Sequence, residues 1–510
     1  MTMQPIPELD LPTFLLAGSA RHGGRPAFVD GRTGRAVRYD ELAPAAGRIA
    51  AGLAARGFRK GDVLAVLAPN VPEWPLALLG ALTAGGAVNG INPLWTTGEI
   101  AAQLTDSGAR FVLTVPPFLD RAREAAGDAR IVLAGGEAPG TIPFAALLAE
   151  TAPLRPVAIS PADTALLPYS SGTTGLPKGV RLTHRNIVAN VLQGEAWTAA
   201  TPHDVVLAAL PYFHAAGSFS GIFLALHGGA TVVTQPRFDL EECLALIQEH
   251  RGTILPAAPP IVLALARHPA VDRYDLSSLE LVVSGSAPLP AAVQRDCAAR
   301  LGRRVVQAYG MTETSTLIAM GRRDPAAPHA DGSVGEPVPG TEIRLVDPHS
   351  GAEAAEVGEL WVRGPQVMAG YLRDEAATAE MIDADGWLRT GDLATLSATG
   401  EIVILDRVKE LIKVGGFQVP PAELEALLVT HPAVADAAVL GRPDPDRGEV
   451  PVAFVAPRGE LDPDAVAAFV AERVAGYKRI AEVRIVDVVP RSPAGKILRR
   501  ALRHAVAAPA

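Results

Sequence analysis

Cysteine is almost absent from this chain of 510 residues, which contains only Cys243 and Cys297. Two cysteines this far apart, with no neighbouring metal-ligand spacing, exclude a disulfide framework and a cysteine-based zinc site. Cys243 shares an apolar helical face with Leu244 and Ile247, and Cys297 lies four residues after Val293. We therefore expect both to be core thiols, as suits a reducing cytosol.

Excess positive charge and long apolar runs are also missing. The net charge of −9 argues against a nucleic-acid partner, although local basic sites for a nucleotide stay possible. The longest apolar run, Leu76 to Val88, is broken by glycines and is shorter than the ~20 residues of a membrane span. The residues after Met1 show no basic segment followed by an apolar one. We expect a cytoplasmic protein with neither a membrane span nor a signal peptide.

Helix-like and buried strand-like segments alternate along the first half of the chain. Val63–Leu67 and Ala87–Ile91, for example, each follow a helix-like segment. This alternation predicts an α/β fold of mostly parallel, helix-covered sheets. After Gly332 short strands with Gly/Pro turns predict a small antiparallel sheet or barrel, and past Arg407 the pattern predicts a compact α+β unit.

A loop rich in glycine and hydroxyl side chains, Tyr169 to Val180, stands between two strand-like runs. Glycines let backbone N–H groups turn inward, and Lys178 adds charge, so the loop could wrap a phosphate. It is not a P-loop, since Pro177 stands where the second glycine is required and Gly179 follows the lysine. Read alone, it could also be a flexible linker.

The letters SSGTTGLPKGV resemble the signature loop of the adenylate-forming superfamily, and further motifs follow in that family's order over almost the whole chain. The family includes acyl-CoA synthetases, 4-coumarate:CoA ligases, firefly luciferase and peptide-synthetase adenylation domains. The resemblance implies that the loop covers the pyrophosphate end of ATP, with Thr173 among the catalytic groups. The loop residues assigned to ATP are Ser170, Ser171, Gly172, Thr173, Thr174, Gly175 and Lys178.

A second motif, Gln307-Ala308-Tyr309-Gly310-Met311-Thr312-Glu313, resembles the family segment that contacts adenine and the α-phosphate. The resemblance implies that Tyr309 stacks on adenine and that Glu313 is catalytic and holds Mg²⁺. A lone carboxylate beside phosphates suits this hard cation. From the residues alone, Tyr309 could be a core aromatic and Glu313 a solvated loop charge.

The resemblance also implies a hinge between two domains. Asp392 would bind the ribose hydroxyls, Arg407 would contact ribose, and Lys409 would be the position where the backbone rotates. The implied division is residues 1–406, a hinge at 407–409 and a small domain at 410–510. Lys413, Gly415, Gly416 and Gln418 would contact coenzyme A, although many coumarate-type ligases have a lysine where Gly415 stands. Without the resemblance, Lys409 and Lys413 read as part of a solvated face.

Lys496 lies in Pro493-Ala494-Gly495-Lys496, which matches the family's last motif. The resemblance implies that its ammonium bridges the attacking carboxylate and the α-phosphate, an electrostatic role typical of phosphoryl chemistry. Out of context, Lys496 beside Arg499 and Arg500 would be a basic tail.

The acid pocket is implied by the segment around His214, which the family uses to flank the carboxylate. His214 is also expected to be catalytic, or else a satisfied core imidazole. Plant coumarate ligases have a tyrosine where Ala216 stands and Pro-Val where Thr316 and Leu317 stand. The expected lining is Tyr212, His214, Ala216, Ser220, Gly285, Ser286, Ala287, Gly310, Thr316 and Leu317.

Together these motifs predict an ATP-dependent acid:CoA ligase that uses ATP, Mg²⁺ and coenzyme A. The expected acid is aryl, cinnamoyl-like or of medium chain length. The alternatives are transfer of the acyl group to a carrier protein, an amine or another nucleophile, a luciferase-like oxygenase, and a noncatalytic nucleotide-binding relative.

Overall fold

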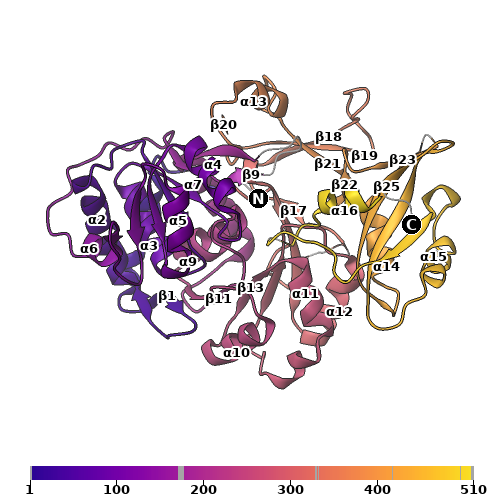
Figure 1. The fold of residues 1–510 in the computed structure, drawn as a ribbon, viewed down its shortest axis with the longest axis horizontal. Helices are drawn as coiled ribbons and strands as arrows, with labels where there is room; N and C mark the ends of the chain where they lie inside the picture. Colours follow the sequence, from indigo (N-terminus) through magenta and orange to yellow (C-terminus); the bar gives the residue numbers. More distant parts are fainter. Residues whose placement is uncertain are drawn as a thin grey trace.

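A computed structural model describes residues 3–170, 177–327, 330, 332–415, 417–493 and 495–506, with only the main chain for 503–506. Two large sheets, each with helices against it, form the body of the molecule (Figure 1). A small antiparallel sheet lies along one side of this body, and a C-terminal unit follows it. No helix in these described ranges has the length and apolar character needed to cross a bilayer.

The first sheet has the strand order β20-β10-β8-β4-β3-β5-β6-β7, and β9 pairs with β10. Strands β8 to β7 along this path are parallel, whereas β10 is antiparallel to β8, β9 and β20. Its strands are β3 (Val63–Leu67), β4 (Ala87–Gly90), β5 (Ala109–Thr114), β6 (Arg130–Leu133), β7 (Ile142–Pro143), β8 (Thr164–Leu166), β9 (Tyr169–Ser170), β10 (Lys178–Thr183) and β20 (Gly370–Tyr371). The helices that follow or connect them include α2 (Tyr39–Ala55), α3 (Glu73–Thr83), α4 (Thr97–Ser107), α5 (Leu119–Ala125) and α6 (Phe144–Leu148).

The local sequence explains why these elements form. All five residues of β3 are buried, as expected for a central parallel strand with both faces covered. Helix α4 begins at a capping box in which Thr96 and Glu99 satisfy each other's backbone N–H groups. It ends at Gly108, whose φ of 65° is the left-handed conformation that glycine adopts without strain.

The second sheet has the order β17-β16-β15-β14-β13-β11-β12-β1-β2 and is parallel from β15 to β1. Its strands are β1 (Pro26–Asp30), β2 (Ala36–Arg38), β11 (Val205–Ala208), β12 (Thr231–Thr234), β13 (Ile254–Ala257), β14 (Leu281–Ser284), β15 (Arg304–Tyr309), β16 (Ala319–Met320) and β17 (Glu336–Pro337). The helices in this part of the chain are α1 (Leu11–Leu16), α7 (His184–Thr198), α8 (Ala215–Ser218), α9 (Leu224–Gly228), α10 (Leu240–His250), α11 (Pro259–Arg267) and α12 (Ala291–Leu301).

Both cysteines lie in the core beside this second sheet. Cys243 on α10 and Cys297 on α12 are buried free thiols in one apolar cluster. Burial raises the pKa of each thiol to about 12, which keeps it protonated and unreactive at neutral pH. The expectation of core thiols is confirmed.

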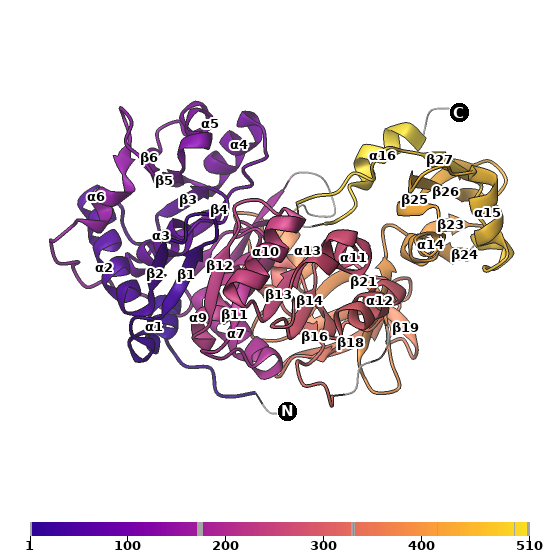
Figure 2. The same cartoon turned by 90° about the horizontal axis from the view of Figure 1, so that it is seen from below.

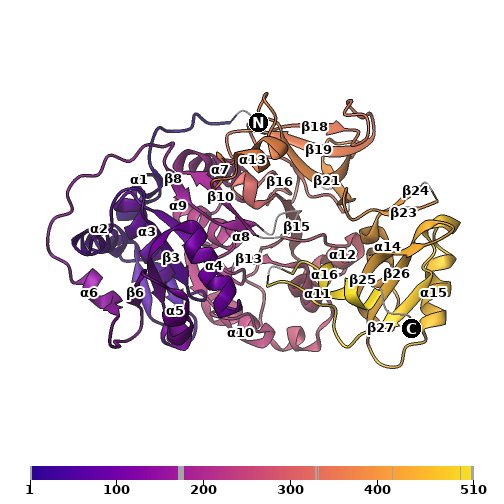
Figure 3. The same cartoon turned by 45° about the horizontal axis from the view of Figure 1, so that its top comes forward.

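The small antiparallel sheet follows the body in sequence, with order β18-β19-β21-β22. Its strands are β18 (Glu342–Val346), β19 (Val357–Arg363), β21 (Leu388–Leu396) and β22 (Ile402–Arg407), and α13 (Glu375–Met381) lies between β20 and β21. Figure 3 shows this sheet, in orange, at the upper right of the view. In the described residues β18 and β22 are its two edges, so it is an open sheet instead of the barrel-like unit allowed by the sequence.

The C-terminal unit is an α+β unit with its own apolar cluster, which runs from Ile412 to Ile480. Its sheet has the order β24-β23-β26-β25, with β27 on β26. The elements are β23 (Ile412–Val414), β24 (Phe417–Val419), α14 (Pro421–Leu428), β25 (Val434–Asp444), β26 (Gly448–Pro457), α15 (Pro463–Ala471), β27 (Glu482–Ile485) and α16 (Arg499–Val506). The sequence predicts a helix over Asp462–Ala475 with Asp462 as its N-cap. Asp462 does cap α15, but the helix ends at Ala471, where a tighter bond runs from the Arg473 N–H to the Val470 carbonyl. The α/β fold class is confirmed, while the domain boundary and hinge stay predictions.

Candidate active site

The carboxyl ends of the parallel strands β13, β14 and β15 converge on one pocket, the usual place for a ligand in such a sheet. Pro256 on β13, Gly285 just after β14 and Tyr309 at the end of β15 all line it. Lys496 from the C-terminal unit lines it as well. Figure 2 shows the yellow segment before α16 reaching back from the C-terminal unit to the body.

Sheet pairing holds the two ends of the glycine-rich loop together. Ser170 at the end of β9 is registered opposite Lys178 at the start of β10. The Lys178 ammonium lies 3.2 Å from a carboxylate oxygen of Asp374 and 5.3 Å from the centre of the Tyr371 ring. The predicted loop residues Ser171, Gly172, Thr173, Thr174 and Gly175 lie outside the described residues.

Glu313 is buried close to the base of this loop. It lies in the short turn Thr312–Thr314, and its Oε1 accepts a 2.9 Å hydrogen bond from the Tyr371 hydroxyl. Tyr371 comes to this position because β20 pairs with β10. The described residues contain no group of three His, Cys, Asp or Glu side chains that could hold a metal ion. A single carboxylate still suits Mg²⁺, because substrate phosphates and water normally supply its other ligands.

The predicted nucleotide motif occupies β15 and the turn after it. Ala308, Tyr309, Gly310, Met311 and Thr312 all line the pocket. Gln307 does not line it. Its buried amide donates to the Leu289 carbonyl at 3.3 Å and to Oε1 of Gln294 at 2.9 Å. These bonds tie β15 to the segment around Leu289 and to α12.

Asp392 contacts two other functional candidates, Tyr309 and Arg407. Its Oδ2 accepts a 2.6 Å hydrogen bond from the Tyr309 hydroxyl, and its Oδ1 lies 2.8 Å from Nε of Arg407. The ion pair follows from sheet register, since Asp392 on β21 is opposite Arg407 on β22. The Asp392 charge raises the pKa of Arg407, and burial raises that of Tyr309. Asp392, Tyr309 and Arg407 therefore hold one another in fixed positions beside the pocket.

His214 precedes α8 as its N-cap residue, and its Nδ1 accepts a 3.4 Å hydrogen bond from the Ala216 N–H. This bond leaves the proton of the neutral ring on Nε2. Burial, followed by the charge of Lys496, lowers the pKa of His214 to about 4. The imidazole is therefore neutral at physiological pH.

Lys496 is held at the pocket by a short, well-anchored turn. Ser492 N–H bonds to the Lys496 carbonyl, and the Lys496 N–H bonds to Oγ of Ser492. Arg491 donates to the Gly495 carbonyl at 2.8 Å and pairs with Asp436 at 2.7 Å. Desolvation and then Arg407 lower the pKa of Lys496, while Asp392, Glu313 and Glu410 oppose that shift. The lysine as a whole is still exposed to solvent.

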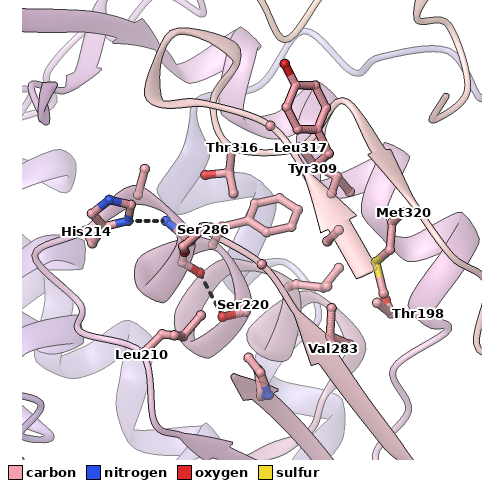
Figure 4. Close-up of a pocket in the computed structure, with 18 of the residues that line it drawn as sticks. Thr198, Leu210, His214, Ser220, Val283, Ser286, Tyr309, Thr316, Leu317 and Met320 are labelled. Carbon is pink, nitrogen blue, oxygen red and sulfur yellow. Dashed lines mark hydrogen bonds between the residues drawn. The ribbon is translucent and has the colours of Figure 1, made fainter. Parts of the chain in front are cut away.

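The rest of the pocket is mostly apolar (Figure 4). Of the expected acid-pocket residues, His214, Ala216, Ser220, Gly285, Ser286, Gly310, Thr316 and Leu317 line it. Tyr212 and Ala287 are not among its lining residues. The Tyr212 ring is buried in the core beside Trp74, 5.9 Å between ring centres.

Sequence reasoning missed much of the pocket wall and several residues that support the site. The additional lining includes Thr198, Ala200, Val206, Leu210, Phe219, Leu224, Ala225, Ile254, Val283 and Met320. In the sequence these look like ordinary core positions, and only the fold brings them together. Tyr371, Asp374 and Arg491 were missed because each acts through a partner distant in sequence.

Of the residues expected at coenzyme A, Lys413, Gly415 and Gln418 are not among those that line this pocket. Lys413 is exposed on β23, and Gln418 on β24 contacts the His349 ring at 2.8 Å. Gly415, directly after β23, has a φ of 56°, a left-handed conformation that favours glycine. Gly416 lies outside the described residues. In this arrangement Lys496, and not the β23–β24 hairpin, reaches the pocket.

Two family models match the chain, "AMP-binding enzyme" over residues 16–372 and "AMP-binding enzyme C-terminal domain" over residues 423–496. The chain belongs to the AMP-binding enzyme family. Its fold and motif order are those of the adenylate-forming enzymes, as the sequence predicted.

Similar proteins cover nearly the whole chain of this AMP-binding enzyme. It is 41% identical to 4-coumarate–CoA ligase 3 of Oryza sativa subsp. japonica, over 98% of this chain and 93% of that protein. ATP-bound MatB from Rhodopseudomonas palustris superposes with a TM-score of 0.89 at 30% identity, covering 98% of this chain and 99% of that one. The anthranilate CoA ligase AuaEII, in complex with anthranoyl-AMP, superposes with a TM-score of 0.91 at 27% identity, covering 99% of this chain and 98% of that one.

Proposed function

We propose that this AMP-binding enzyme is an ATP-dependent carboxylic acid:CoA ligase that works through an acyl-adenylate. A carboxylate oxygen of the acid attacks the α-phosphorus of ATP and pyrophosphate leaves. The coenzyme A thiol, having lost its proton, then attacks the acyl carbon, and AMP leaves. The observation that most supports this is the meeting of Lys496, His214 and Tyr309 on one largely apolar pocket.

The charged groups around the pocket fit the first step. Negative charge builds up on the carboxylate and phosphate oxygens, and the Lys496 ammonium is suited to neutralise it. Asp392 is a fixed anionic acceptor for ribose hydroxyls, held by Tyr309 and Arg407. The neutral His214 ring offers its Nε2–H as a donor.

Glu313 would hold Mg²⁺, whose charge would balance that of the phosphates. Lys178 and the glycine-rich loop would bind the pyrophosphate end of ATP. Coenzyme A would approach along Lys413, Gly415, Gly416 and Gln418 after the C-terminal unit rotates about Lys409, which would withdraw Lys496 from the pocket.

The apolar pocket favours an acid with a ring or chain that carries no charge. Among the described residues that line the pocket there is no Asp or Glu, and Lys496 is the only cationic side chain. We therefore keep an aryl, cinnamoyl-like or medium-chain acid as the substrate class. We also propose a cytoplasmic location, supported by two buried free thiols.

The test is an ATP–pyrophosphate exchange screen over aryl and fatty acids, followed by product analysis with and without coenzyme A. We expect exchange that requires an acid but not coenzyme A, and AMP plus a thioester when coenzyme A is added. Acyl-adenylate that persists with coenzyme A, but disappears with an amine or a carrier protein, would contradict the proposed acceptor.

A further inference from the structure

Tyr371 lies between the two charged side chains that we assign to the phosphates of ATP. Its hydroxyl donates a 2.9 Å hydrogen bond to Oε1 of Glu313, and the centre of its ring lies 5.3 Å from the Lys178 ammonium. Tyr371 is buried, and no other side chain in the described ranges donates a hydrogen bond to Glu313. One tyrosine therefore connects the carboxylate proposed for Mg²⁺ with the lysine proposed for pyrophosphate.

The main chain around Tyr371 joins the same two parts of the structure. The Met368 N–H donates to the Glu313 carbonyl at 2.8 Å, and the Leu372 N–H donates to the Gly179 carbonyl at 2.7 Å. Strand β20 also pairs with β10 at the base of the glycine-rich loop. The turn that carries Glu313 and the base of the loop are thus held at a fixed separation.

A second residue that follows β20 holds Lys178. Oδ2 of Asp374 lies 3.2 Å from the Lys178 ammonium, while its Oδ1 accepts a 2.9 Å hydrogen bond from the Ala377 N–H and caps α13. Because this cap fixes the Asp374 side chain, the lysine has a fixed anion beside it. The ammonium is thereby also kept over the Tyr371 ring, a contact that favours a cation.

The bond between Tyr371 and Glu313 fixes the direction of the carboxylate. Desolvation, followed by the charge of Glu313, raises the pKa of Tyr371, so the hydroxyl keeps its proton and stays a donor. The bond engages one carboxylate oxygen and limits the rotation of the group, which is therefore oriented in advance for a cation. Removing a hydrogen bond that orients a metal-binding side chain commonly costs about 10- to 100-fold in metal affinity.

We propose that Tyr371 is a positioning residue for the adenylation step. Its hydroxyl orients Glu313 for Mg²⁺, and its ring holds Lys178 at the pyrophosphate end of ATP. This inference rests on the proposed ligase function. A tyrosine that only stabilised the fold would affect ATP binding equally with and without Mg²⁺. A tyrosine that acts through Glu313 affects ATP binding only when Mg²⁺ is present.

The experiment measures the affinity for ATP by titration calorimetry in Mg²⁺ and in EDTA, without an acid, so that no adenylate forms. Tyr371→Phe keeps the ring beside Lys178 and loses the bond to Glu313. We expect its Kd for ATP in EDTA to stay close to that of wild type. The gain in affinity that Mg²⁺ gives should shrink by about tenfold or more.

Two further variants make this test specific. In a Glu313→Gln background, Tyr371→Phe should cause no additional loss of the Mg²⁺-dependent gain, because it acts through the Glu313 carboxylate. Tyr39→Phe is the matched control, since the buried Tyr39 hydroxyl donates to the Ala230 carbonyl at 2.7 Å and Tyr39 does not line the pocket. This control should bind ATP like wild type in both buffers.

The inference is overturned if Tyr371→Phe keeps the full Mg²⁺-dependent gain, or if it weakens ATP binding equally in Mg²⁺ and in EDTA. An additional loss in the Glu313→Gln background would also overturn it, as would a wild type whose ATP binding does not depend on Mg²⁺. If wild type binds no ATP in either buffer, the proposed ligase function itself is contradicted.

Discussion

Lys496 and His214 line the same pocket although the C-terminal unit provides the first and the α7–α9 region of the body provides the second. The proximity of Lys496 contributes to the low pKa of His214, because a second positive charge there is unfavourable. The pocket wall therefore combines the Lys496 ammonium with a neutral His214 imidazole around the place proposed for the reacting carboxylate. This division of charge leads to the first prediction.

His214 should not titrate in the working pH range of the enzyme. Its pKa is lowered to about 4, so the ring stays neutral above about pH 5. The ratio of wild-type to His214→Ala rates in ATP–pyrophosphate exchange should stay constant between pH 5.5 and 8, with the variant slower throughout. A ratio that changes about tenfold around pH 6.5 would show instead that His214 acts as a titrating acid or base.

Asp392 should contribute mainly to ATP binding. Asp392→Asn weakens its ion pair with Arg407 and removes the anionic acceptor proposed for ribose. We expect kcat/KM for ATP to fall about 10- to 100-fold, the usual effect of losing a hydrogen bond to a charged group. Tyr309→Phe, which keeps the ring but loses the bond to Asp392, is the milder comparison. An unchanged KM for ATP in folded Asp392→Asn would contradict the ribose assignment.

Glu425 should make stability fall as pH rises. Its side chain on α14 is 14% exposed and accepts hydrogen bonds from Arg499 at 2.6 Å and the Val439 N–H at 2.8 Å. Its pKa is raised to about 7, first by desolvation. Between about pH 4.5 and 7 the folded state keeps a proton that the unfolded state has lost, so stability decreases through this window. The contribution is on the order of 3 kcal/mol.

Glu425→Gln removes this proton uptake. The thermal stability of the variant relative to wild type should increase from pH 5 to pH 8, as measured by calorimetric unfolding at each pH. Glu472→Gln, at a largely exposed position, is the control and should follow wild type. Parallel curves for wild type and Glu425→Gln would refute the raised pKa.

Lys409→Pro should separate the two half-reactions. Proline fixes φ near −65°, which would hold one arrangement of the C-terminal unit if the backbone rotates at Lys409. With Lys496 at the pocket, we expect pyrophosphate exchange to survive and thioester formation from supplied acyl-adenylate to fall at least tenfold. Stopped-flow or quench measurements of each step test this, and unchanged rates of both would remove the hinge assignment.

The sequence predicted the architecture well because the strands leave strong local signals. The five buried residues of β3 are apparent from the letters alone. The open edges of the small sheet were not apparent, because pairing between distant strands is a tertiary property. The longer prediction for α15 failed because its Ala-rich sequence favours helix beyond Ala471, where the structure tightens into a turn.

For the site, the sequence motifs predicted which residues carry the chemistry better than they predicted which residues line the pocket. Asp392, His214 and Lys496 are recognisable from their neighbours in the sequence, yet the bond between Asp392 and Tyr309 depends on two sheets meeting. Tyr212 was expected in the pocket because its segment resembles the one around the family's pocket histidine, but its ring is buried in the core beside Trp74. Sequence proximity to a functional residue does not fix the direction of a side chain.

The most direct test of the proposed mechanism measures both half-reactions in Lys496→Ala. Pyrophosphate release from ATP and acid should fall by about a thousandfold, a loss typical of removing a charge that stabilises a transition state. Thioester formation from supplied acyl-adenylate and coenzyme A should stay within a few fold of wild type. If the folded variant loses both half-reactions equally, or loses neither, Lys496 does not have the role proposed for it.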